Sequence, residues 1–236
     1  MQDRPAPRKT SLVIFRAFGT DVTLHASFFL VPGILVAPGI LAGDFQGAGF
    51  EAGIILLVYL SVLAHEYGHV AAARVAGVRT PAIVLHAIGG LALMNKPPDG
   101  WPARLGTSLA GPLVSAFIAA ASFGLEALRT GNLESPDPYS PPALIILGLV
   151  NLVIVALNML PIYPLDGGQA LRALMTPALG DRKAETASDV IGVITGSVAA
   201  FAAFSWGVYL MAALLAAAGV FAASRLFEKV RSARQG

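Results

Sequence analysis

The stretch LVYLSVLAHEYGHVAAARVAG, residues 57–77, decides how the rest of the chain is interpreted. It is almost wholly apolar, as a helix in hydrocarbon should be, but His65, Glu66 and His69 lie in its middle. Ionisable side chains inside a membrane-spanning segment cost a few kcal/mol each, so they usually mark function. The stretch therefore predicts a membrane helix that carries a chemical site.

The composition of the whole chain agrees with a membrane protein. Of its 236 residues, 56% are hydrophobic and 13% are charged, and the mean hydropathy of +0.70 lies above the usual range of soluble domains. Cysteine is absent, so a metal ion would have to be held by His, Asp or Glu. The net charge is +2, and the basic residues are spread along the chain instead of forming one patch, so no nucleic-acid partner is expected.

Six apolar stretches come close to the roughly 20 residues that a helix needs to cross a bilayer. They are residues 24–41, 52–75, 105–128, 143–160, 190–204 and 206–223. With six crossings, Arg129 is the only one of the 16 Lys and Arg residues that falls on one side of the membrane. Since positive charge favours the cytoplasmic side, both termini are expected in the cytoplasm.

The spacing of the polar residues in the second stretch favours a metal site. His65 and His69 are four residues apart, so on a helix they project from one face and can reach a single ion. Glu66 lies about 100° around the helix from His65, where it could contact a metal-bound water without being a ligand. The alternative is a polar cluster that hydrogen-bonds to neighbouring helices.

A third ligand is expected from Asp166, in the segment NMLPIYPLDGGQ at residues 158–169. Pro161 and Pro164 interrupt the helix there, and the glycines that follow Asp166 allow a sharp turn, so the carboxylate can be presented from irregular chain. The alternative is an ordinary capping Asp at the start of a helix. The second and fourth stretches run in the same direction across the membrane, and both carry their motifs in the cytoplasmic half.

The two motifs together resemble those of the site-2 protease family of intramembrane zinc metalloproteases. The similar segments are HEYGH at 65–69 and NMLPIYPLDGG at 158–168, with VTLHASFFL at 22–30, the glycine pair at 89–90 and AGPLVS at 110–115 as further pieces. The resemblance implies one zinc ion per chain, bound by His65, His69 and Asp166, with Glu66 as the general base. It also implies that Asn158 orients or stabilises the scissile carbonyl, although interhelical hydrogen bonding is an equal alternative for this residue.

Residues 80–101 are rich in β-formers and glycine, and the resemblance implies a membrane-associated β-hairpin around Gly89 and Gly90 that binds an unwound substrate strand. An amphipathic loop packed over the protein is the alternative. The expected fold is thus an all-α membrane protein with about six transmembrane helices and a small β-hairpin between the second and third. His25 and His86 each stand alone on their segments, and a structural role is expected for both.

The expected organisation is a single integral-membrane protease domain over residues 1–236. Its catalytic core spans about 22–170, two further helices span about 188–224, and no PDZ or CBS domain fits the length. The expected activity is that of a zinc-dependent endopeptidase that cleaves single-span membrane proteins in the bilayer, as in regulated intramembrane proteolysis, in a prokaryotic cell membrane. Two alternatives remain: a divalent-metal transporter, which should have several intramembrane carboxylates along a path, and an inactive homologue that binds a membrane partner, which should lack Glu66.

Overall fold

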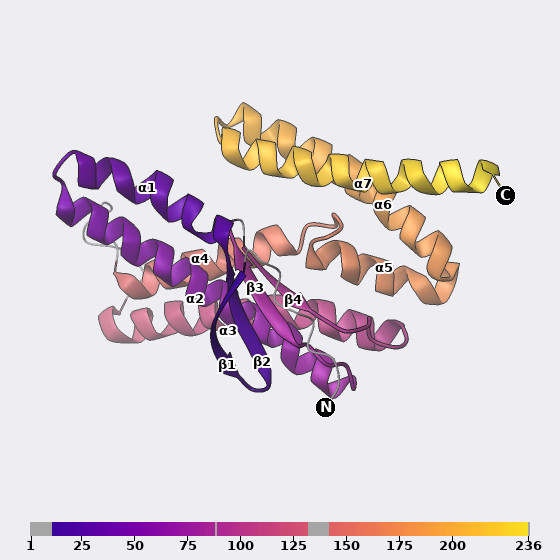
Figure 1. Cartoon of the computed structure of the whole chain (residues 1–236), viewed down its shortest axis with the longest axis horizontal. Coiled ribbons are helices and arrows are strands. Elements are labelled where there is room, and N and C mark those ends of the chain that lie inside the picture. Colours follow the sequence, from indigo (N-terminus) through magenta and orange to yellow (C-terminus); the bar gives the residue numbers. More distant parts are fainter. Residues whose placement is uncertain (1–10, 88, 132–141, 236) are drawn as a thin grey trace. The chain divides into compact units, whose positions relative to one another are not determined.

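The computed structural model describes residues 11–87, 89–131 and 142–235 (Figure 1). Within these ranges the chain is mostly helical, and its strands form one four-stranded sheet. The chain divides into two compact units, and the divisions fall just before and inside α3 (Trp101–Thr130) and inside α4 (Ala143–Asn158). The first unit holds the described residues up to Pro98 and Leu113–Val155, and the second holds Asp99–Pro112 and the described residues from Ala156 onward.

The first unit is built around α2 (Phe45–Val75), which packs against α1 (Leu30–Leu41). Asp44 begins α2 by accepting a hydrogen bond from the Gly47 amide at 2.9 Å, a typical N-cap. The long helix is apolar except for the site residues, which lie on its buried face. The expected helix 52–75 is therefore confirmed, and it begins earlier than expected.

The sheet contains β1 (Ser11–Ala17), β2 (Thr20–His25), β3 (Ala82–His86) and β4 (Gly89–Leu93), in that spatial order. Strands β2 and β3 are parallel, and the two outer pairs are antiparallel. The turn between β1 and β2 has positive φ at both central residues, Phe18 and Gly19, as in tight hairpin turns. The sheet lies alongside α2 (Figure 1), and the buried residues Val22, Val70 and Ile83 form the core between them.

The expected hairpin between the second and third helices is confirmed as β3 and β4, but the all-α description is wrong in one respect. The hairpin is half of a larger sheet, because β2 pairs with β3, whose paired residues lie 61 positions further along the sequence. The Thr20 and Thr23 hydroxyls add hydrogen bonds to the carbonyls of Thr80 and Ile83, at 2.9 and 3.1 Å. This pairing draws residues 24 and 25 into a strand, so the first expected helix, 24–41, is shortened.

The second unit contains α5 (Asp166–Leu179), α6 (Asp181–Ser205) and α7 (Tyr209–Gln235). Helices α6 and α7 form an antiparallel pair (Figure 1), in which Gly196 and Gly219 allow the two backbones to approach closely. A Cβ atom on Gly196 would lie 2.9 Å from the Gly219 Cα atom. Ile162, in the segment before α5, is fully buried against both helices.

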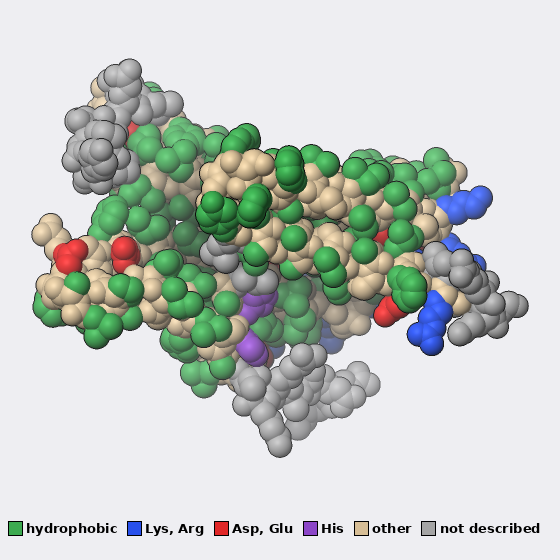
Figure 2. Space-filling model, turned by 90° about the horizontal axis from the view of Figure 1, so that it is seen from above, with side chains coloured by type: hydrophobic (Ala, Val, Ile, Leu, Met, Phe, Trp, Pro, Cys, Tyr) green, Lys and Arg blue, Asp and Glu red, His purple; other side chains and the backbone are tan. Residues whose placement is uncertain are grey.

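Four helices in the described part of the chain are long and apolar enough to cross a membrane. They are Phe45–Val75, Trp101–Thr130, Asp181–Ser205 and Met211–Lys229. Two shorter apolar helices are Ala26–Leu41 and Ala143–Asn158. Hydrophobic side chains cover much of the surface drawn in Figure 2, and Leu113, Phe117 and Phe201 are among the large ones that are exposed. Such a surface suits contact with lipid, and the chain is an integral membrane protein.

Candidate metal centre

The two histidines of α2 face each other at a distance that suits a shared metal ion. Their Nε2 atoms are 3.2 Å apart, and both side chains are almost completely buried. Two nitrogens that each bind a tetrahedral zinc ion at about 2.0–2.1 Å lie about 3.3 Å apart. The arrangement of His65 and His69 therefore fits two corners of a zinc site, as their spacing in the sequence predicted.

A serine on another helix holds the first of these histidines. The Nδ1 atom of His65 lies 3.0 Å from the Oγ atom of Ser115 on α3, and Ser115 is fully buried. When Nδ1–H donates to this hydroxyl, the Nε2 atom keeps its lone pair for a metal. The contact fixes the orientation of the ring.

Glu66 lies against the edge of the sheet. Its Oε2 atom accepts a hydrogen bond from the Ala92 amide of β4 at 2.9 Å. Gly90 allows this approach, because a Cβ atom there would lie 2.6 Å from the Glu66 Cγ atom and 2.9 Å from its Oε1 atom. The carboxylate is buried, and it belongs to the same turn of α2 as His65.

In the second unit, Asp166 is the first residue of α5 and is also buried. The preceding segment folds back over the first turn of this helix, and two glycines make the fold possible. A Cβ atom on Gly167 would lie 2.3 Å from the Met159 carbonyl oxygen, and one on Gly168 would lie 2.4 Å from the Tyr163 nitrogen. The glycines that were expected to allow a turn are thus required by backbone contact, and the role of Asp166 as a ligand stays a prediction.

The remaining candidates are distributed over both units. Asn158 is the last residue of α4 and is half-buried, and its part in chemistry stays a prediction. Gly89 has a φ of 141° and opens β4 opposite His86. His25 caps the short helix Ala26–Phe29 by accepting a hydrogen bond from the Ser27 amide at 3.2 Å, which is a structural role.

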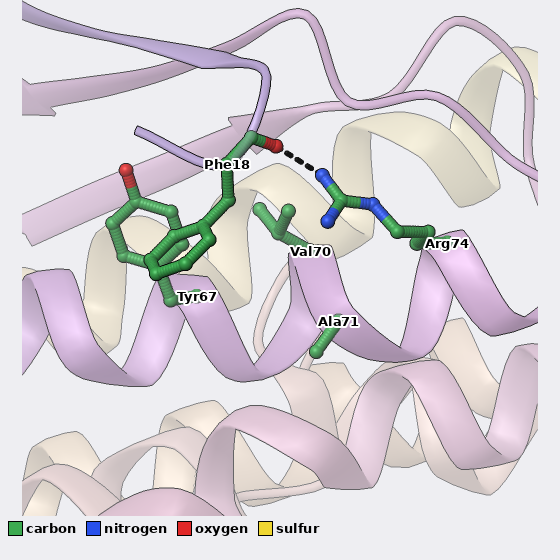
Figure 3. Close-up of a pocket in the computed structure, with 5 residues that line it drawn as sticks. All are labelled: Phe18, Tyr67, Val70, Ala71 and Arg74. Atoms are coloured by element: carbon green, nitrogen blue, oxygen red, sulfur yellow. Dashed lines mark hydrogen bonds between the residues drawn. The ribbon is translucent and has the colours of Figure 1, made fainter. Parts of the chain in front are cut away.

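A cleft on the first unit contains none of the candidate site residues (Figure 3). It has a volume of about 260 Å³ and is lined by Phe18, Tyr67, Val70, Ala71 and Arg74. Its walls are apolar, and the Arg74 guanidinium at its end donates to the Phe18 carbonyl oxygen. The cleft holds no His or carboxylate, so it has no metal-binding chemistry of its own.

The sequence analysis did not identify two contributions to the centre. Ser115 was quoted within AGPLVS but was given no role, although a hydroxyl in an apolar helix was a usable signal. The Ala92 amide carried no signal at all, because a backbone donor is the same in every residue. Both contacts depend on which segments the fold brings together.

Comparison with known proteins gives consistent matches. The Peptidase M50B-like family matches residues 50–165, and peptidase family M50 matches residues 140–221. A zinc metalloprotease of Methanocaldococcus jannaschii is 32% identical over 182 residues, which are 77% of this chain and 50% of that protein. Stage IV sporulation protein FB of Bacillus subtilis is 28% identical over 155 residues, which are 64% of this chain and 48% of that protein. The chain thus spans about half the length of these curated relatives.

A solved structure agrees over nearly the whole chain. The site-2 protease from Methanocaldococcus jannaschii superposes with a TM-score of 0.66 at 26% sequence identity. The match covers 92% of this chain and 95% of that one.

Proposed function

Since the chain belongs to the site-2 protease family of M50 peptidases, we propose that it is a zinc-dependent endopeptidase. Its substrates in this proposal are single-span membrane proteins, which it cleaves within or near their transmembrane segments. One observation carries the proposal: the Nε2 atoms of His65 and His69 on α2 are 3.2 Å apart, and Glu66 directly follows His65.

The proposed metal ligands are His65, His69 and Asp166, with one zinc ion per chain. Two imidazole nitrogens and one carboxylate oxygen are a usual donor set for catalytic zinc, and they leave one position open. The buried state of all three side chains also fits, because buried ionisable groups need a partner of opposite charge or a metal. A bound zinc ion would supply Lewis acidity, which makes a water molecule nucleophilic near neutral pH.

Glu66 is the proposed general base. It takes a proton from the attacking water and later delivers it to the leaving amine of the cleaved peptide. The hydrogen bond from the Ala92 amide fixes the Glu66 carboxylate beside the edge of β4. Asn158 is proposed to orient or stabilise the scissile carbonyl, as the family resemblance implies.

The outer edge of β4 is the proposed binding surface for the substrate, with Gly89 and Gly90 as its contact residues. β4 is the last strand of the sheet, and its Ala92 amide points to Glu66 and away from β3. An extended peptide that paired with this edge would pass close to the carboxylate. Because a transmembrane helix hides its carbonyls in its own hydrogen bonds, the substrate has to unwind locally before it can pair.

The proposed topology has six crossings: the four long apolar helices and the two shorter ones, Ala26–Leu41 and Ala143–Asn158. In this proposal the helices span a prokaryotic cell membrane, and both termini lie in the cytoplasm. The distribution of Lys and Arg supports this orientation, although Arg4, Arg8 and Lys9 lie outside the described residues.

The test is to purify the wild-type chain and the Glu66→Gln variant in detergent, measure bound zinc, and incubate each with labelled single-span substrates. We expect about one zinc ion per chain in both and cleavage by the wild type alone, because the amide can neither accept nor deliver the proton. His69→Ala is the matched variant that should lose zinc as well as activity.

The same preparation separates the proposal from its alternatives. A wild-type chain that binds no zinc, even after reconstitution, would refute the metal site. Transport of zinc across the membrane of vesicles that contain the Glu66→Gln variant would favour a transporter. Zinc in both proteins without cleavage of any single-span substrate would favour an inactive homologue.

A further inference from the structure

Five charged side chains from α5, α6 and α7 form ion pairs with one another at one end of the α6 and α7 pair. This ion cluster, all within the second unit, consists of Arg172, Glu185, Asp189, Arg225 and Lys229. Lys229 lies 2.5 Å from the Asp189 carboxylate and 3.1 Å from that of Glu185, and Arg172 lies 3.1 Å from Glu185. The Asp189 side chain is only 2% exposed. A carboxylate buried this deeply needs a partner of opposite charge, which Lys229 and Arg225 supply.

Arg225 connects the ion cluster to the segment that precedes Asp166. Its guanidinium ion pairs with Glu185 and lies 3.9 Å from the Asp189 carboxylate. Its central carbon also lies 3.8 Å from the centre of the Tyr163 ring, which is cation–π geometry. The ring of Phe221 also lies near Tyr163, nearly parallel to it at a centroid distance of 6.1 Å.

The two helices also hold the residues on both sides of Tyr163. Ile162 is fully buried against Ala203, Ala212 and Leu215. The Ser188 hydroxyl donates to the Gly168 carbonyl oxygen at 3.0 Å. Asp166 therefore lies in the middle of a segment that α6 and α7 fix on both its N-terminal and its C-terminal side.

From these contacts we propose that Arg225 is a positioning residue for the metal centre. The two carboxylates of α6 hold the guanidinium over the Tyr163 ring, and the ring in turn fixes the chain three residues before Asp166. The direction of the Asp166 carboxylate is thereby set by a residue near the C-terminal end of the chain. The inference rests on the proposed role of Asp166 as a zinc ligand.

The test compares the wild-type chain with two variants, Arg225→Met and Tyr163→Leu. The first removes the guanidinium and the second removes the ring of the cation–π contact. Tyr163→Phe is the conservative variant that keeps the ring, and Arg231→Met removes an exposed basic residue of the same helix. Zinc affinity is measured by chelator competition, and the ligand geometry is read from the visible spectrum of the cobalt-substituted protein. Neither readout depends on activity, and the cobalt spectrum reports the ligand geometry, which a loss of thermal stability alone would not change.

We expect zinc affinity to fall about 10-fold and the cobalt spectrum to change in Arg225→Met and in Tyr163→Leu, with no change in Tyr163→Phe or Arg231→Met. The double variant should lose no more than either single variant, since both remove one contact. Wild-type affinity and spectrum in both single variants would overturn the inference while leaving the proposed function intact. An Asp166→Ala variant with wild-type affinity would instead refute the proposed ligand set, and this inference with it.

Discussion

At the scale of single residues, the histidine pair depends on a hydroxyl from another helix. Ser115 is fully buried and lies 3.0 Å from the Nδ1 atom of His65. Without this hydroxyl, the His65 ring would lose a buried hydrogen bond that orients it. Hydrogen bonds of this kind to metal ligands contribute to metal affinity.

We predict that Ser115→Ala lowers zinc affinity about 10-fold, measured by chelator competition on the purified chain. Ser108→Ala is the matched control, because its hydroxyl bonds to the Arg104 carbonyl of its own helix. Equal zinc affinity in Ser115→Ala and the wild type would show that the hydroxyl does not orient His65.

The close approach of Gly90 to Glu66 predicts that a side chain at position 90 lowers activity. Its Cα atom is so near Glu66 that an added methyl group would lie 2.6 Å from the Cγ atom, which forces the strand or the carboxylate to move. A displacement of about 1 Å at a catalytic group can cost about 100-fold in rate, and we expect a loss of that order in kcat/KM for Gly90→Ala. Gly106→Ala, on α3 with open space around it, should keep its activity. Wild-type kcat/KM in Gly90→Ala would contradict the close approach.

At the scale of elements, β3, which lies beside β2 in the sheet, ends at His86, and the fold favours the neutral form of this histidine. Burial, and to a smaller extent the neighbouring His25, lower the pKa of His86 from its usual 6.5. The carbonyl of His86 is also close to the Tyr59 hydroxyl of α2, at 3.5 Å. Protonation of this ring is therefore less favourable in the folded chain than in the unfolded one.

The stability that follows from this lowered pKa is complete above pH 6.5 and is lost as the pH falls toward the lower pKa of the folded state. We predict that the thermal midpoint of the wild type falls between about pH 7.5 and pH 5, and that His86→Gln loses less over the same range. The measurement is thermal unfolding in detergent at each pH. An equal fall of the thermal midpoint with pH in the wild type and in His86→Gln would show that His86 does not cause the pH dependence.

At the scale of the whole molecule, the charges and the apolar helices predict which ends of the helices face the cytoplasm. The chain has no cysteine, so single cysteines can be introduced without background. Thr130, at the end of α3, and Lys183, in the first turn of α6, are both exposed and should lie on opposite sides of the membrane.

We predict that Thr130→Cys in intact cells reacts with a membrane-impermeant maleimide, and that Lys183→Cys reacts only after the membrane is opened. Labelling of both in intact cells, or of neither, would contradict the six-crossing topology. Reversed labelling would place the termini outside the cell.

The sequence by itself determined the long helices and the two motifs. Hydrophobic segments and the spacing of His65 and His69 are local properties, set by the thickness of the bilayer and the period of the helix. Both can be read without knowledge of any contact. The glycines after Asp166 were also identified, although their reason is backbone contact with the segment 159–163.

Only the tertiary structure decided which distant segments meet. The pairing of β2 with β3, the hydroxyl of Ser115 on His65 and the amide of Ala92 on Glu66 each join parts of the chain that are 26 to 61 residues apart. The last two helices looked generic in the sequence, yet they hold the segment before Asp166 through Arg225 and Ile162. Such contacts depend on shape and distance in three dimensions, and the order of residues along one segment does not encode them.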